Sequence, residues 1–133
     1  MNSELNNCSI RDKKIYFFYK QFLFENKKKE MIEDLYQNFS EYNFSEKAEQ
    51  EIFKIIENFQ EIENKVIKAL PDDWRWTRIN NLEKAILFYS IAEMFIFNQK
   101  KAIAIDNAIE FAKKYCDVKT YRLINLILDK IEI

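Results

Sequence analysis

Cationic and aromatic side chains crowd one short stretch of the sequence, AIEFAKKYCDVKTYRLINLILDK, which covers residues 108–130. Lysine and arginine can neutralise phosphates and tyrosine rings can stack on unpaired bases, so this mixture is typical of a surface that holds nucleic acid. The alternative is that the cations solvate helix ends while the rings lie in the core. The side chains concerned are Lys113, Lys114, Tyr115, Lys119, Tyr121 and Arg122.

Missing residue types exclude several other kinds of chemistry. The 133 residues include no glycine, so a glycine-rich phosphate loop is excluded, and no histidine, the usual proton shuttle and commonest metal ligand. Cys8 and Cys116 form no Cys-x-x-Cys pair, and the adjacent carboxylates Asp72 and Asp73 lack a third metal ligand. We therefore predict a protein that is not an enzyme and that needs no metal and no cofactor.

The net charge of −1 conceals an uneven distribution of charges along the chain. Residues 11–29 carry seven cations and two acids, whereas residues 30–63 carry ten acids and two cations. Residues 64–101 return to a cationic excess, with seven cations and four acids. This pattern predicts a basic face suited to an anionic partner and an acidic face that is solvated.

Apolar residues recur with the spacing of amphipathic helices, and no strand pattern survives. The apolar run at 85–97 is too short to cross a bilayer, which predicts a buried core helix in a cytoplasmic protein with no membrane partner. Residues 1–133 are expected to form a single all-α domain of six or seven helices. The predicted helices cover about residues 9–24, 30–39, 45–70, 80–97, 105–115 and 117–131, with one further turn near 71–78.

Three blocks in the second half of the chain resemble a known family. They read LEKAILFYSIAEMF (82–95), AIDNAIEFAKKY (104–115) and INLILDK (124–130). In sequence and in spacing they are similar to the NusB family of transcription antitermination factors. The resemblance implies an all-helical fold of two packed bundles that binds boxA-type RNA of ribosomal RNA leaders. It also implies a NusE-type ribosomal protein and the antitermination complex of RNA polymerase as partners.

The same resemblance assigns candidate RNA-binding residues at both ends of the chain. Lys14 is added to them because it is a helical neighbour of Arg11. The function depends on whether these cations and rings converge on one exposed face. The candidates are Arg11, Lys14, Tyr19, Tyr115, Lys119 and Arg122.

Contact with the ribosomal protein is assigned to Glu83, with Leu82 and Ile86 as nearby apolar contacts. Each of these residues also has a structural explanation. Glu83 can support a helix cap at Asn80, and the two apolar residues can pack in the core. Both roles are compatible for Glu83.

Departures from the family pattern support an alternative function. Cys116 and Leu126 stand where the family has glycine, and the basic start of the chain is reduced to Arg11, Lys13 and Lys14. The alternative is a diverged NusB-fold protein-interaction module that has lost RNA binding. A homodimer is compatible with either reading. A methyltransferase, which some relatives of this type form with an attached cofactor domain, is not expected.

Overall fold

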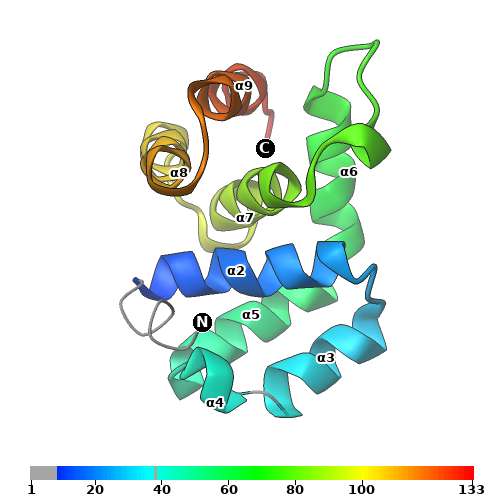
Figure 1. Cartoon of the computed structure of the whole chain (residues 1–133), viewed down its shortest axis with the longest axis vertical. Helices are drawn as coiled ribbons and strands as arrows, with labels where there is room; N and C mark the ends of the chain where they lie inside the picture. Colours follow the sequence, from blue (N-terminus) through cyan, green and yellow to red (C-terminus); the bar gives the residue numbers. More distant parts are fainter. Residues whose placement is uncertain (1–8, 38) are drawn as a thin grey trace. The chain divides into compact units, whose positions relative to one another are not determined.

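The structure is a computed structural model that describes residues 9–37 and 39–133. It comprises two compact units, which we name unit 1 (Met1–Asn58) and unit 2 (Phe59–Ile133). Helices account for all the regular secondary structure of the described residues (Figure 1), so the prediction of an all-α fold is confirmed. The expectation that residues 1–133 act as a single domain stays a prediction, and Cys8 lies outside the described residues.

The described helices of unit 1 surround an aromatic core. The buried ring of Tyr42 stacks on Phe44, with centroids 5.2 Å apart, and meets Phe17 edge to face at 5.4 Å. Phe17 in turn meets Phe18 edge to face at 5.1 Å, and such pairs add stability beyond their buried area. The helices are α2 (Ile10–Leu23), α3 (Lys28–Gln37), α4 (Phe39–Tyr42) and α5 (Glu46–Glu57).

In unit 2, one apolar helix lies at the centre of the others. Every residue from Ala85 to Met94 on α7 is buried, which confirms the predicted core helix. Helix α7 packs against α6, α8 and α9, and α8 lies alongside α9 (Figure 1). The elements are α6 (Phe59–Ala69), the short 3₁₀ turn η1 (Trp76–Arg78), α7 (Asn81–Phe97), α8 (Lys101–Tyr115) and α9 (Val118–Asp129).

Side-chain caps begin four of these helices at residues that the sequence indicates. Ser9 and Ser45 accept the backbone N–H three residues ahead through their hydroxyl oxygens, at 3.0 and 3.1 Å, before α2 and α5. Before α7 and α9, the amide oxygen of Asn80 and a carboxylate oxygen of Asp117 accept the corresponding N–H at 2.8 and 2.9 Å. Each cap satisfies an amide that the helix itself leaves without a partner, which fixes where the helix starts.

The prediction of one long helix over residues 45–70 is wrong. The helix is interrupted at Asn58, where φ is −107° and ψ is 18°, and α6 begins at the next residue. The Asn58 side chain donates to the carbonyl of Lys54 at 2.8 Å, and its backbone N–H donates to that of Ile55 at 3.1 Å. Asparagine side chains compete for backbone groups in this way, and here the competition ends α5 at the boundary between the units.

None of the helices in the described part of the chain combines the length and the apolar character that a membrane crossing requires.

Candidate nucleic-acid interface

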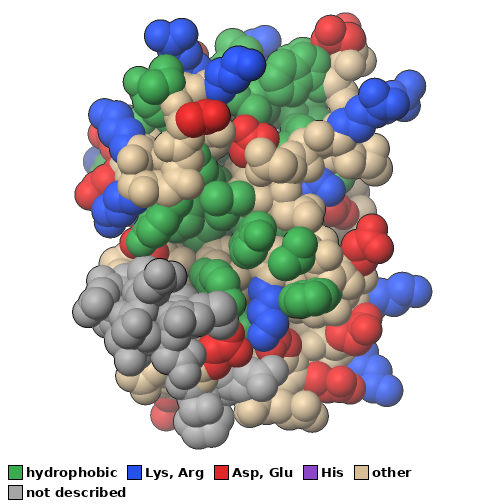
Figure 2. Space-filling view, viewed as in Figure 1, with side chains coloured by type: hydrophobic (Ala, Val, Ile, Leu, Met, Phe, Trp, Pro, Cys, Tyr) green, Lys and Arg blue, Asp and Glu red, His purple; other side chains and the backbone are tan. Residues whose placement is uncertain are grey.

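In unit 2, the candidate site forms where α8 ends and α9 begins. Cys116 ends α8 with an extended backbone, and Asp117 begins α9 by accepting the Thr120 N–H at 2.9 Å. Hydrogen bonds from the Thr120 amide and hydroxyl hold the pKa of the Asp117 carboxyl below its usual value. Figure 2 shows lysine and arginine side chains over α8 and α9, interspersed with acidic and apolar ones. We name this α8–α9 junction, residues 113–122, the corner.

The two glycine replacements, Cys116 at the corner and Leu126 later in α9, cause no strained backbone. Cys116 has φ −131°, and Leu126 lies within the regular helix α9. Positive φ values among the described residues occur elsewhere, at Glu25, Asn43 and Asn98. The side chains of Cys116 and Leu126 are therefore accommodated without the left-handed conformation that favours glycine.

Three predicted RNA-binding residues are exposed at the corner. Tyr115 is 48% exposed, and its ring centroid lies 4.6 Å from that of Phe111, which supports one side of the ring. Lys119 and Arg122 are exposed and lie three residues apart on α9, so they share one face of the helix. The Arg122 side chain has no hydrogen bond or ion pair with any residue that the structure describes. The corner thus offers an accessible ring and two exposed cations within eight residues of the chain.

A further cation–aromatic contact joins the two helices of the corner. The Lys113 ammonium on α8 lies 5.8 Å from the ring centroid of Tyr121 on α9. Both residues stand out in the sequence, but their pairing depends on how α8 packs against α9 and could not be predicted from it. The contact favours one orientation of these two side chains at the corner.

The unit 1 candidates have different surroundings. Lys14 is buried, and its ammonium forms an ion pair with Glu51 of α5 at 2.7 Å. Tyr19 is half-buried, with its ring centroid 6.4 Å from that of Tyr16, and Arg11 is partly exposed near the start of α2. Arg11 and Tyr19 remain partly accessible, whereas the charge of Lys14 is already neutralised within unit 1.

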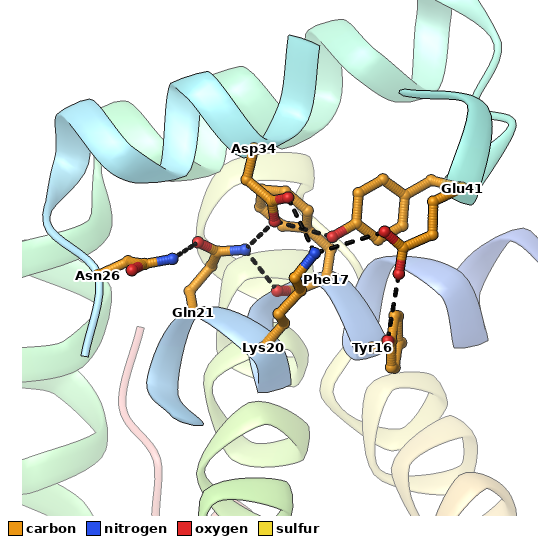
Figure 3. A network of polar contacts seen from close by, with 8 residues as sticks. Tyr16, Phe17, Lys20, Gln21, Asn26, Asp34 and Glu41 are labelled. Atoms are coloured by element: carbon orange, nitrogen blue, oxygen red, sulfur yellow. Dashed lines mark hydrogen bonds and ion pairs between the residues drawn. The ribbon is translucent and has the colours of Figure 1, made fainter. Parts of the chain in front are cut away.

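A polar network in unit 1 engages another lysine of the basic segment (Figure 3). Asp34 on α3 accepts the Lys20 ammonium at 3.0 Å, the Gln21 amide at 2.7 Å and the Tyr42 hydroxyl at 2.8 Å. Lys20 also lies 3.4 Å from the carboxylate of Glu41. The network joins α2, α3 and α4 and satisfies groups that would be costly to bury without partners.

The tyrosine hydroxyls of this network are held protonated. Burial, followed by the hydrogen bond to Asp34, raises the pKa of Tyr42 well above its ordinary value. Burial and the neighbouring Glu41 carboxylate raise the pKa of Tyr16 to about 12, and its hydroxyl donates to Glu41 at 3.3 Å. Both groups are therefore stable hydrogen-bond donors, and the network does not titrate through its tyrosines near neutral pH.

The candidate partner residues lie at the start of α7. The backbone N–H of Glu83 donates to the Asn80 side chain, and one oxygen of the Glu83 carboxylate lies 3.1 Å from the Thr120 hydroxyl of α9. Sequence reasoning missed this link between two helix starts, because the residues are 37 positions apart. Leu82 is half-buried, whereas Ile86 is fully buried and packs inside unit 2.

The described residues contain no group of three or more histidine, cysteine, aspartate or glutamate side chains placed to hold a metal ion. Asp72 and Asp73 are exposed in the connection between α6 and α7. The nearby Trp76 is held by a structural contact, since its indole N–H donates to Glu63 of α6 at 2.9 Å. Lys84 lies over the same ring at 5.4 Å.

Several known proteins similar to this chain share a family name. The sequence model of the NusB family matches residues 6–132. Proteins named Transcription antitermination protein NusB from Dictyoglomus turgidum, Gloeothece citriformis and Microcystis aeruginosa are 30%, 31% and 35% identical to it. The alignments cover 84%, 75% and 69% of this chain, and 76%, 47% and 42% of those relatives.

The chain thus spans less than half the length of the two cyanobacterial relatives and about three quarters of the Dictyoglomus protein. The family match extends over both units and over every helix that the structure describes. Together with the all-helical fold, it shows that the chain belongs to the NusB family of antitermination factors.

Proposed function

We propose that the chain is a non-catalytic RNA-binding protein that acts in transcription antitermination in the cytoplasm. Its RNA ligand is a boxA-type sequence of ribosomal RNA leaders, bound together with a NusE-type ribosomal protein in the RNA polymerase antitermination complex. The names of its relatives support a role in transcription antitermination. The observation that carries the proposal is the corner, where Tyr115, Lys119 and Arg122 are all exposed within eight residues of the chain.

The corner has the chemistry that single-stranded RNA requires. The accessible part of the Tyr115 ring offers a stacking platform for an unpaired base, and Phe111 limits its freedom to turn away. Lys119 and Arg122 supply positive charge for the phosphates on either side of that base. Arg11 and Tyr19 on α2 extend the contact in the proposed complex, which requires that unit 1 presents them to the same RNA strand.

Glu83 and Leu82 form the proposed contact with the ribosomal protein. One Glu83 oxygen is engaged by Thr120, while the other can accept a hydrogen bond from a partner. The half-buried Leu82 next to it supplies apolar area. Ile86, which is fully buried, supports these residues from inside the unit.

Filter binding of a boxA RNA and a scrambled RNA at several salt concentrations tests the RNA contact. We expect Tyr115→Ala to weaken boxA binding roughly 5- to 100-fold, because a stacking contact is lost. Arg122→Ala should lower the salt slope by about 0.7, the value for one phosphate contact of a single strand. The measurements are made with and without the NusE-type protein.

Matched variants separate a local contact from a general loss of charge or aromatic area. Tyr36 is also 48% exposed, but on α3, and Arg75 is exposed in the connection before α7. Tyr36→Ala and Arg75→Ala should bind boxA RNA as the unchanged protein does. Equal binding of boxA and scrambled RNA by the unchanged protein, in both the presence and the absence of the partner, would reject the proposal.

The ion pair of Lys14 favours a second candidate, a protein-interaction module without RNA binding. A cation that is buried against Glu51 contributes little to attracting phosphates. This candidate predicts that Arg11→Ala and Arg122→Ala leave RNA association unchanged. The NusE-type protein would still be captured, and Glu83→Ala would abolish the capture. Crosslinking of boxA RNA that depends on Arg122 would reject this candidate.

A further inference from the structure

The cations of the basic segment separate into two groups in unit 1. Lys14 and Lys20 are engaged by carboxylates, and Lys13 is buried. Lys27, with the two lysines that follow it, lies exposed between the end of α2 and the first turn of α3. The accessible positive charge of the segment is therefore concentrated at residues 27–29.

An exposed aromatic ring precedes these lysines. Phe24, the residue that ends α2, is 63% exposed, the largest value among the exposed large hydrophobic residues that the structure describes. Leu23 beside it is 46% exposed, and Glu25 turns the chain with φ of 52°. The turn between α2 and α3 thus carries an exposed phenyl ring three residues before a run of three exposed lysines. We name Phe24 and Lys27–Lys29 the α2–α3 patch.

Folding stability does not explain this patch. Cations near the first turn of a helix are disfavoured by the positive end of the helix dipole, and Lys28 and Lys29 occupy that position in α3. The Lys27 amide is already capped by Glu30 at 2.8 Å, so the lysine side chains are not needed there. A phenyl ring that is largely in water also gains little from burial. Features that break local rules without a structural gain mark candidate functional sites.

We propose that the α2–α3 patch is an additional RNA contact that binds nucleotides flanking the boxA element. Phe24 stacks on an unpaired base, and the three lysines neutralise neighbouring phosphates. The inference rests on the function proposed above and adds a contact for sequence outside boxA. Glu25 and Glu30 limit the positive charge of the turn, so the contact is weak alone and is independent of base sequence.

RNAs of two lengths test this inference. The short RNA holds boxA alone, and the long RNAs add roughly 6 uridines at the 5′ or the 3′ end. We expect the unchanged protein to bind one of the long RNAs more tightly than the short one, with a steeper salt dependence. Replacing Lys27, Lys28 and Lys29 by alanine should lower the salt slope for that RNA by about 2. Phe24→Ala should weaken the same complex roughly 5- to 100-fold.

Control variants keep the two proposals distinguishable. Neither change in the patch should alter binding of the short RNA, whereas Tyr115→Ala should weaken both lengths. Lys47→Ala with Lys54→Ala removes exposed lysines from α5, and Leu23→Ala removes an exposed aliphatic neighbour of Phe24; both should bind as the unchanged protein does. Phe24→Trp should restore the affinity that Phe24→Ala loses.

The inference is overturned if extension adds no affinity, if the patch variants weaken the short RNA equally, or if the α5 lysines have the same effect. If the unchanged protein shows no preference for boxA over scrambled RNA, this result would instead count against the proposed function. Binding to the long RNA that still depends on Phe24 would then leave the patch as a general RNA contact.

Discussion

Lys14 and Arg122 both lie on amphipathic helices, yet Lys14 is buried against Glu51 in unit 1 and Arg122 is exposed on α9 in unit 2. The difference comes from the neighbouring helices. Helix α2 packs among acidic side chains of α3, α4 and α5, which neutralise its Lys14 and Lys20. Helix α9 packs its apolar residues against α7 and α8, and its cations face water. A basic segment therefore does not locate a basic surface until the acids opposite it are known.

The largest expected effect is on the network of unit 1. Asp34→Ala removes the acceptor of Lys20, Gln21 and Tyr42 and leaves a partly buried cation with a weaker partner. We expect unit 1 to lose about 3–5 kcal/mol of unfolding free energy. Urea unfolding and hydrogen exchange of the α2 amides measure this loss of unfolding free energy. A loss under about 1 kcal/mol would show that the network contributes no more than a surface contact.

A direct comparison of the two cations sharpens the contrast. Lys14→Ala should destabilise the protein by about 1–3 kcal/mol, because the Glu51 carboxylate loses its partner at a largely buried position. Arg122→Ala should change stability by less than about 0.5 kcal/mol, as is usual at the surface. Lys14→Met keeps the aliphatic stem and separates packing from charge. Equal losses for the two alanine variants would remove the contrast.

The link between the starts of α7 and α9 gives a smaller effect. Thr120→Val keeps the shape of the side chain but removes the hydroxyl that lies 3.1 Å from the carboxylates of Glu83 and Asp117. We expect Thr120→Val to lower the free energy of unfolding by about 1 kcal/mol. In a variant that already carries Glu83→Ala the loss should be smaller, because only the contact with Asp117 remains to be removed. A double-mutant cycle by thermal unfolding measures the coupling. If the stability losses of the two single variants add fully in the double variant, the contact between Glu83 and Thr120 does not stabilise the fold.

The smallest effect on stability at neutral pH concerns Cys116 at the corner. Burial, with a minor effect of Glu83 and Asp117, raises the pKa of its thiol to about 11. In a Cys8→Ser variant, alkylation at pH 8 should be roughly 10- to 100-fold slower in the folded than in the unfolded chain.

The unfolded chain loses the thiol proton first, so the contribution of Cys116 to stability should fall as pH rises from about 9 toward about 11. The Cys116→Ser variant is the control, since serine does not titrate in this range. Equally fast alkylation of folded and unfolded chains would indicate that the corner is more open than the structure shows.

Local features of the fold could be predicted from the sequence because their causes are local. Ser9, Ser45, Asn80 and Asp117 each satisfy an amide only three residues away, and the apolar run of α7 needs no knowledge of its neighbours. The break at Asn58 could not be predicted from apolar spacing, since that spacing continues through the break. An asparagine followed by helix-compatible residues is too weak a signal.

Pairings between distant residues could not be predicted from one sequence. The ion pair of Lys14 with Glu51 spans 37 positions, as does the contact of Thr120 with Glu83. The same limit applies to the candidate site. Its residues Tyr115, Lys119 and Arg122 are neighbours in sequence and are exposed together, whereas the convergence of Arg11 and Tyr19 with them stays a prediction.

The interruption of the helix at Asn58 has a consequence for affinity. A single residue separates α5 from α6, so the two units are joined by a very short tether. In the proposed complex one RNA strand would contact both units. A strand held weakly by one unit would then meet the other at a high effective concentration, so that the affinities of two modest contacts combine. Lengthening the tether at Asn58 with a flexible insert would lower the combined affinity for the RNA strand, while the affinity of each separate contact would stay unchanged.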